Sequence, residues 1–415
     1  MKKLICLLLV LGMLFPYSVY AEEQPQEQVQ QQEQNKNQTQ EQNQTTETMD
    51  DTKSMEELIA NAKAGVLMEQ STGEIIYKKN MDEQLAIASM TKMVAQTIIL
   101  EHIESGKIKW EDIVTVSKNA AGMGGSQIYL TEGEKMSVKD LFKGISMASG
   151  NDATLAMAEY IAGTEQKFVE LMNQKVKELG LKNTTFKNCT GLDEEGHVSS
   201  AYDMAVIARN LLMHEKILDF SSVYEDYLRQ NTENQFWLVN TNKLVRFYDG
   251  ADGLKTGHTD AAGYCLAATA KKNGMRLIAI VLGEENSKIR NSEAMSLLDY
   301  GFNTKKIAIL KKKTDVVKEI KFDKGNKDKI KISPKYDVGI LQDKTTEKHE
   351  YTYDIKLNEL TLPIKAGDKL GTITVKEKNK KLNEVDLVSR TNIKKLSYME
   401  LLIENIKNSI MGIVI

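Results

Sequence analysis

The chain has 415 residues, which is more than one compact core usually holds and favours two folded domains. Its hydrophobic content of 41% suffices for globular packing, and its net charge of −3 gives no electrostatic reason to expect a nucleic-acid partner. The five histidines form no HxxxH pair and no cysteine has metal-ligand spacing, so we expect no metal and no other cofactor.

The first residues have the layout of a secretory signal peptide. Lys2 and Lys3 form a basic start, residues 4–15 are apolar, and a small residue, Ala21, precedes two acidic ones. This pattern predicts a signal peptide over residues 1–21, and therefore export. An uncleaved membrane anchor is the alternative, although the apolar stretch is short for a helix that spans a bilayer.

Residues 22–53 are dominated by Gln, Glu, Asn and Thr and lack periodic apolar positions. Such a segment cannot bury enough apolar surface to offset the entropy of folding, so we expect a disordered spacer.

Hairpin and helix patterns alternate over residues 54–307. Turn sequences at 70–73 and 272–274 lie between short apolar runs and predict two β-hairpins. Apolar residues at helical spacing predict helices over residues 90–103, 138–147, 153–161, 168–179, 200–213 and 293–301. Ser199 or Ser200 is the expected N-cap of the fifth of these. Hairpins at both ends of a helical region predict an α+β domain, with an antiparallel sheet covered by helices.

The pattern changes after about residue 308. Tyr351, Tyr353, Ile355 and Leu357 alternate with polar residues, and this period predicts a small β-rich domain over residues 308–392. Residues 393–415 return to helical spacing and predict an amphipathic helix. Such a helix either lies on a membrane surface or packs on the protein itself.

Ser89-Met90-Thr91-Lys92 stands where a loop enters an apolar helix. Residues i and i+3 share one face of a helix, so Lys92 is expected to reach the Ser89 hydroxyl. A serine needs an adjacent base to become a good nucleophile, and a lysine among apolar neighbours loses its proton more easily. An S-x-x-K motif alone is weak evidence, because an N-capped helix with a surface lysine looks the same.

Two more polar triplets follow. Ser149-Gly150-Asn151 breaks two helical stretches and predicts a tight loop that faces a cleft. Lys255-Thr256-Gly257 precedes a hairpin strand, where it could offer a cation and a hydroxyl to a carboxylate, with Gly257 leaving room for a substrate backbone. Each triplet alone is common by chance.

In this order the three motifs form the signature set of penicillin-binding proteins and class A β-lactamases. The segments around them, residues 86–93 and 252–264, resemble those of the D-alanyl-D-alanine carboxypeptidases, as do residues 190–193 and 199–205. These enzymes are low-molecular-mass penicillin-binding proteins of the S11 type of serine peptidase. The resemblance runs from about Glu57 to the C-terminus and includes the β-rich region.

The resemblance implies a β-lactamase/penicillin-binding-protein-like catalytic domain. Its expected substrate is a peptidoglycan stem peptide, from which it would remove the terminal D-alanine through an acyl-enzyme. β-Lactam antibiotics would acylate the same serine. The chain would act outside the cell, on the outer face of the cytoplasmic membrane, held there by its C-terminal helix.

The resemblance also implies roles for single residues. Ser89 would be the acylated nucleophile and Lys92 its general base. Ser149 would relay a proton to the leaving D-alanine, and Asn151 would hold the peptide backbone. Lys255 would bind the terminal carboxylate and support the proton relay.

Four more residues would bind substrate. Thr256 would bind the carboxylate with Lys255, and Gly257 would lie on the same strand. The backbone N–H of His258 would form an oxyanion hole with that of Ser89. Arg290, expected just before the last helix of the domain, would help to read the carboxylate, and a solvated surface charge is its alternative.

Rival functions stay open at this point. A β-lactamase shares the nucleophile, but no E-x-x-x-N segment lies between Asn151 and Lys255. A transpeptidase or endopeptidase uses the same acylation step, and a non-catalytic wall-binding protein could keep the fold. His197 is expected to be a loop residue, and whether Cys189 and Cys265 pair is open.

Overall fold

The computed structural model describes residues 58–321, 325, 329–346 and 350–411. The predicted signal peptide (1–21) and spacer (22–53) lie outside the described residues. Within the described part, no helix is both long enough and apolar enough to cross a lipid bilayer.

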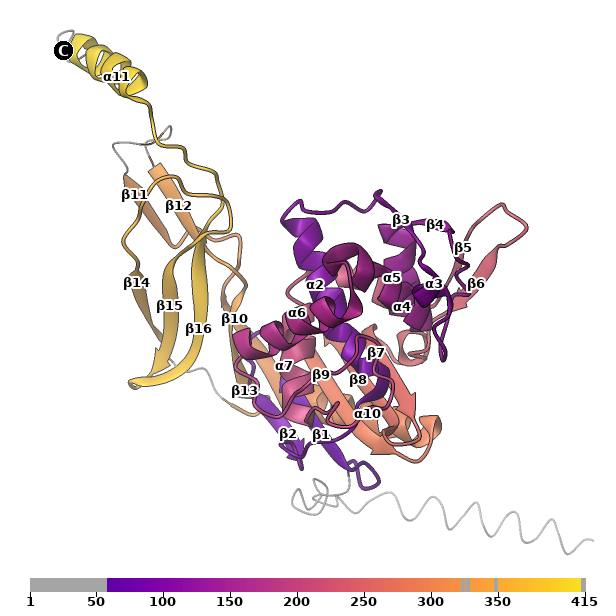
Figure 1. Ribbon diagram of the computed structural model, residues 1–415. Helices are drawn as coiled ribbons and strands as arrows, with labels where there is room; N and C mark the ends of the chain where they lie inside the picture. Colours follow the sequence, from indigo (N-terminus) through magenta and orange to yellow (C-terminus); the bar gives the residue numbers. More distant parts are fainter. Residues whose placement is uncertain (1–57, 322–324, 326–328, 347–349, 412–415) are drawn as a thin grey trace, which may run out of the picture. The chain divides into compact units, whose positions relative to one another are not determined.

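A five-stranded antiparallel sheet forms the centre of the first folded region (Figure 1), with strand order β2-β1-β9-β8-β7. Its strands are β1 (Ala64–Glu69), β2 (Ile75–Lys79), β7 (Ala251–Thr259), β8 (Gly263–Lys272) and β9 (Met275–Glu284). Both predicted hairpins, β1–β2 and β8–β9, are confirmed. In the second hairpin Asn273 and Gly274 both have positive φ, as a tight two-residue turn requires.

The sheet is buried on both faces because successive side chains of its strands enter two different cores. In β9, Ile278 and Ile280 pack into the core formed with the helical region, whereas Leu277 and Ala279 pack into the core on the other side. The second core contains apolar side chains of the helix α10 (Ser287–Thr304). The two cores hold the sheet rigidly between helices.

Most of the remaining helices of this region form an α-helical part beside the sheet (Figure 1). The remaining helices are α2 (Lys92–Glu104), α3 (Lys118–Ala121), α4 (Val138–Ala148), α5 (Asn151–Ala162), α6 (Glu165–Glu178), α7 (Ala201–Leu211), α8 (Leu218–Ser221) and α9 (Leu244–Phe247). Two 3₁₀ turns, Ala88–Thr91 and Glu215–Ile217, lead into α2 and α8. All six helices expected from the periodicity are present. Two small two-stranded sheets were not expected: β3 (Ile113–Thr115) with β4 (Lys135–Ser137), and the hairpin of β5 (Glu225–Leu228) with β6 (Phe236–Val239).

Helix starts follow their capping residues. Ser200 is the N-cap of α7, because its side chain accepts a hydrogen bond from the Asp203 N–H. Asn286 caps α10 in the same way through the N–H groups of Lys288 and Ile289. The predicted helix at 293–301 was therefore too short at its start, where polar residues hide the helical period.

The region after α10 is β-rich, as expected. Its strands are β10 (Lys305–Lys311), β11 (Lys318–Lys321), β12 (Lys329–Pro334), β13 (Val338–Asp343), β14 (Thr352–Leu357), β15 (Lys369–Glu377) and β16 (Lys380–Ser389). They form a two-stranded sheet, β10-β13, and a five-stranded sheet, β11-β12-β16-β15-β14. Apolar side chains such as Ile332, Ile373 and Leu387 form its own core.

The last described element is α11 (Tyr398–Met411), which lies within the helix predicted for 393–415. Residues 412–415 lie outside the described part. Among the apolar side chains described on α11, Tyr398, Met399, Leu402, Ile403 and Ile406 are exposed.

Candidate active site

The Ser89 hydroxyl lies beside a buried lysine at the start of α2. Ser89 is in the 3₁₀ turn, and Lys92 is the first residue of the helix that follows. The Lys92 Nζ atom is 2.8 Å from Ser89 Oγ, 2.6 Å from Asn151 Oδ1 and 2.6 Å from the carbonyl oxygen of Thr190. The predicted contact between Ser89 and Lys92 is therefore present, and Thr190 is a partner that the sequence did not indicate.

Burial changes the acidity of Lys92. Its side chain is completely buried, and desolvation disfavours the charged form, which lowers the pKa of Lys92 to about 7. The Cys189 thiol and the Asp152 carboxylate raise this pKa, but they do not outweigh burial. A lysine of this kind exchanges its proton near neutral pH, as a general base must.

The second motif lies at the break between α4 and α5. Ser149 ends α4 in a left-handed conformation (φ 62°), and its buried hydroxyl has no hydrogen-bond partner among the described residues. Asn151 begins α5. Its amide oxygen accepts from Lys92, and its Nδ2 donates to the Gly124 carbonyl at 2.7 Å. The amide of Asn151 is therefore held at both ends.

The third motif lies on β7, an edge strand of the sheet, directly before the hairpin strand β8. Lys255 is buried, and its Nζ donates to the Thr256 carbonyl at 2.9 Å. Burial lowers the pKa of Lys255 well below its usual range, and the positive charges of Lys92 and Arg290 lower it further. The Thr256 hydroxyl donates to Thr241 Oγ1, while the His258 side chain is exposed and stacks on Tyr264.

Two glycines bring the backbone close to Ser89. A Cβ atom on Gly257 would lie 2.7 Å from the Ile87 carbonyl oxygen and 3.2 Å from the Ser89 nitrogen. A Cβ atom on Gly191 would lie 1.9 Å from the Ala88 carbonyl oxygen, and Gly191 has a positive φ of 87°. Neither position tolerates a side chain unless the nucleophile moves. At Gly257 the missing side chain makes room for the enzyme's own backbone at Ile87 and Ser89, and room for a substrate backbone stays a prediction.

Arg290 lies within the first turn of α10, so its expected place just before the helix was wrong. The Asn286 cap starts the helix earlier than its apolar residues indicate. The Arg290 side chain is buried, and its guanidinium donates to Asn291 Oδ1. The charge of Arg290 lowers the pKa of Lys255, so Arg290 lies near the third motif. Because its side chain is buried, the alternative of a solvated surface charge was wrong.

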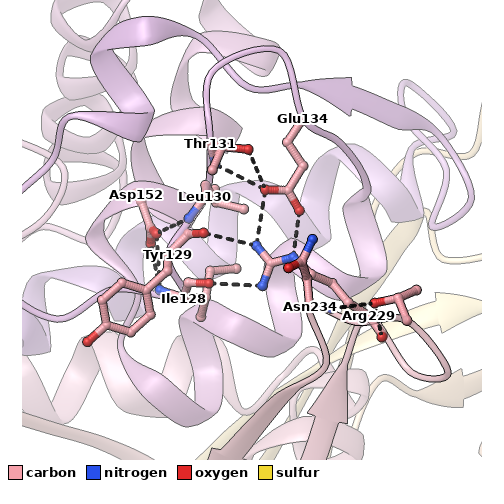
Figure 2. Close-up of polar contacts among 9 residues, drawn as sticks. Ile128, Tyr129, Leu130, Thr131, Glu134, Asp152, Arg229 and Asn234 are labelled. Carbon is pink, nitrogen blue, oxygen red and sulfur yellow. Dashed lines mark hydrogen bonds and ion pairs between the residues drawn. The ribbon is translucent and has the colours of Figure 1, made fainter.

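The loop before the β4 strand contacts Asn151 through the Gly124 carbonyl. Figure 2 shows that Asp152 and Arg229 hold the same loop from two sides. Asp152 accepts hydrogen bonds from the N–H groups of Ile128 and Leu130. Arg229, at the end of β5, donates to the carbonyl oxygens of Ile128 and Tyr129 and to both oxygens of Glu134. The sequence did not single out Arg229, because its partners are distant in the chain.

Both cysteines of the described part are buried free thiols. Cys189 directly precedes Thr190, and Cys265 lies opposite Gly257 on the neighbouring strand. Burial raises the pKa of both thiols, to about 11 for Cys265, so neither behaves as a reactive thiolate.

Comparison with known proteins gives consistent matches. The family described as "D-alanyl-D-alanine carboxypeptidase" matches residues 49–286, and "Penicillin-binding protein 5, C-terminal domain" matches residues 302–395. D-alanyl-D-alanine carboxypeptidase DacF of Bacillus subtilis (strain 168) is 47% identical over 347 residues, covering 83% of this chain and 89% of DacF. DacA of Escherichia coli (strain K12) is 33% identical and covers 84% of this chain and 87% of DacA.

Solved structures agree with these matches. Penicillin-binding protein 5 from Haemophilus influenzae superposes with a TM-score of 0.63 at 31% identity, covering 81% of this chain and 98% of that one. Penicillin-binding protein D2 from Listeria monocytogenes, in its ampicillin-bound form, gives a TM-score of 0.53 at 30% identity, covering 58% and 98%. With a serine beside a buried lysine at the start of α2, this chain belongs to the D-alanyl-D-alanine carboxypeptidase family, the serine peptidases of the S11 type.

Proposed function

We propose that Ser89 is the nucleophile with which this serine carboxypeptidase removes the terminal D-alanine of peptidoglycan stem peptides. The observation that carries the proposal is the 2.8 Å contact between Ser89 Oγ and the buried Nζ of Lys92, whose pKa is lowered to about 7. A serine hydroxyl with such a base beside it is an activated nucleophile.

Lys92 acts as the general base because of where its partners lie. The oxygens of Asn151 and Thr190 can only accept, so a neutral Lys92 gives them its two N–H groups. Its lone pair then faces Ser89 Oγ. The hydroxyl proton moves to Nζ while Oγ bonds to the carbonyl carbon of the penultimate D-alanine. The backbone N–H groups of Ser89 and His258 stabilise the negative charge that develops on the carbonyl oxygen.

The leaving D-alanine needs a proton and a carboxylate site. The Ser149 hydroxyl, which has no partner among the described residues, gives its proton to the departing nitrogen as the C–N bond breaks. Ser149 takes a proton back from protonated Lys92, which is then neutral again. Lys255, Thr256 and Arg290 together bind the terminal carboxylate by charge and hydroxyl contact. Water then hydrolyses the ester on Ser89, which regains its hydroxyl and releases the shortened peptide.

β-Lactams are expected to acylate the same serine. The matched Listeria protein has solved structures in ampicillin-bound and cefotaxime-bound forms. This chain shares the fold with it and has Ser89 beside Lys92, so a penicillin should form a stable ester on Ser89.

We place the enzyme outside the cytoplasm, at the outer face of the membrane. The signal-like residues 1–21 support export. The exposed apolar side chains of α11, among them Leu402 and Ile406, support contact with a membrane surface. Peptidoglycan, the proposed substrate, lies in the same compartment.

The test is release of D-alanine from a stem pentapeptide, with Ser89→Ala as the matched variant. Wild type should release D-alanine and Ser89→Ala should not. Fast turnover of a penicillin would instead point to a β-lactamase. Transfer to an added amine in preference to water would point to a transpeptidase, and release by Ser89→Ala would refute the role of Ser89.

A further inference from the structure

The peptide bond between Ala88 and Ser89 has an orientation that matters for catalysis. Its N–H is one of the two proposed oxyanion donors, and its C=O belongs to Ala88, which has a positive φ of 48°. In a planar trans peptide the C=O and N–H point in opposite directions, so whatever holds the carbonyl also aims the N–H. The Ala88 carbonyl accepts a hydrogen bond from Thr91 Oγ1 at 2.8 Å.

Behind Thr91 stands His197, a residue to which the proposed mechanism gives no part. His197 Nε2 lies 2.8 Å from Thr91 Oγ1, and its Nδ1 lies 3.1 Å from the backbone nitrogen of Lys187. The ring is buried and packs edge-on against Phe186. His197 thus connects the turn that carries Ser89 to the backbone at Lys187.

The directions of the hydrogen bonds that link Lys187, His197, Thr91 and Ala88 follow from the groups that can only donate. The Lys187 N–H can only donate, so His197 Nδ1 accepts and carries no hydrogen. A neutral ring then has its hydrogen on Nε2 and donates it to Thr91 Oγ1. The single hydrogen of the Thr91 hydroxyl remains for the Ala88 carbonyl. All three bonds run in one direction, from Lys187 to Ala88.

We propose that His197 is a positioning residue, which acts through Thr91 to hold the Ala88–Ser89 peptide so that the Ser89 N–H faces the reacting carbonyl. The inference rests on the proposed function, because it concerns the oxyanion formed during acylation. Since this charge develops only in the transition state, a misaimed N–H lowers the rate of the chemical step and leaves substrate binding almost unchanged.

The lowered pKa of His197 agrees with a neutral ring. Desolvation lowers the pKa of His197 to about 4, and Lys92 lowers it as well, whereas Glu194 and Asp193 raise it. At neutral pH the ring is uncharged, so His197 does not serve as a second base beside Lys92.

The test compares three single variants and one double variant with the wild type. Thr91→Val removes the donor to Ala88 and Thr91→Ser restores it. His197→Phe keeps an aromatic ring against Phe186 but removes both nitrogens. The readouts are the rate constant for acylation by a fluorescent penicillin, and kcat and KM for D-alanine release. Acylation is counted per active site, with thermal unfolding of each variant measured in parallel.

We expect His197→Phe to lower kcat and the acylation rate about 10-fold, less than the 10²–10³ seen when an oxyanion donor is deleted. KM should change little, Thr91→Ser should retain the rate, and Thr91→Val combined with His197→Phe should match Thr91→Val alone. Wild-type rates in both Thr91→Val and His197→Phe, or losses confined to Tm and active fraction, would overturn the inference. Absence of acylation in wild type would instead overturn the proposed function.

Discussion

Lys92 has three oxygen atoms around its amine, and one of them, the Ser89 hydroxyl, can give up a proton. Lys92 can therefore take a proton only from Ser89, and not from its other two oxygen partners. Burial supplies the lowered pKa, and the fixed acceptors of Asn151 and Thr190 supply the direction.

The pH dependence of acylation follows from the pKa of Lys92. The neutral amine is the reactive form, and it grows as pH rises through about 7. The rate constant for acylation by a penicillin should therefore rise between pH 6 and pH 8 and level off above. Lys92→Arg, whose guanidinium stays charged, should show background rates throughout. A wild-type rate independent of pH over this range would contradict this role.

Substitution of Gly257 should change the geometry around the nucleophile directly. Gly257→Ala places a Cβ atom 2.7 Å from the Ile87 carbonyl and pushes the nucleophile segment aside. A displacement near 1 Å costs about 100-fold in rate, so kcat/KM should fall by this factor. As a control, Gly106→Ala strains a positive φ by about 1 kcal/mol, with open space around it. Equal kcat/KM in the two variants would contradict the predicted clash between a Cβ atom at position 257 and the nucleophile segment.

At the scale of elements, Arg229 joins the β5–β6 hairpin to the loop that approaches Asn151 (Figure 2). Burial alone would raise the pKa of Glu134, but its hydrogen bonds to Arg229 and Thr131 lower it overall. The ion pair is largely shielded from solvent, so its loss leaves carbonyl groups without their partner.

Arg229→Lys should destabilise the protein by about 1–3 kcal/mol, because an ammonium cannot reproduce the forked contacts of a guanidinium. Urea unfolding gives the stability, and amide hydrogen exchange of residues 124–131 reports on the loop. KM for the peptide should also rise. Arg246→Lys, an exposed arginine on the neighbouring α9 helix, is the control. Equal stability and equal exchange in both variants would contradict the role of Arg229 in holding this loop.

The sequence predicted helices and strands correctly where the apolar periodicity or the turn motif was strong. The two hairpins of the central sheet and the helices around the serine–lysine pair are present, because their apolar residues recur at regular spacing. The start of α10 was missed because its first turn is polar. Arg229 and the contacts of Gly191 and Thr190 join segments distant in the chain, and one-dimensional spacing carries no signal for such pairs.

For the molecule as a whole, α11 is expected to be separable from catalysis. A chain that ends at residue 395 should release D-alanine at the wild-type rate, since none of the proposed catalytic residues lies beyond that point. It should no longer sediment with vesicles of anionic and neutral lipid, whereas the chain with α11 should. Equal sedimentation of the two chains would contradict membrane contact through α11.

The most direct test of the account is the identity of the acylated atom. Wild-type protein is incubated with a penicillin, quenched, digested and analysed by mass spectrometry. We predict one penicilloyl adduct per chain, on the peptide that contains Ser89, and none in Ser89→Ala. An adduct on another residue, or an equal adduct in Ser89→Ala, would contradict the assignment of Ser89 as the nucleophile.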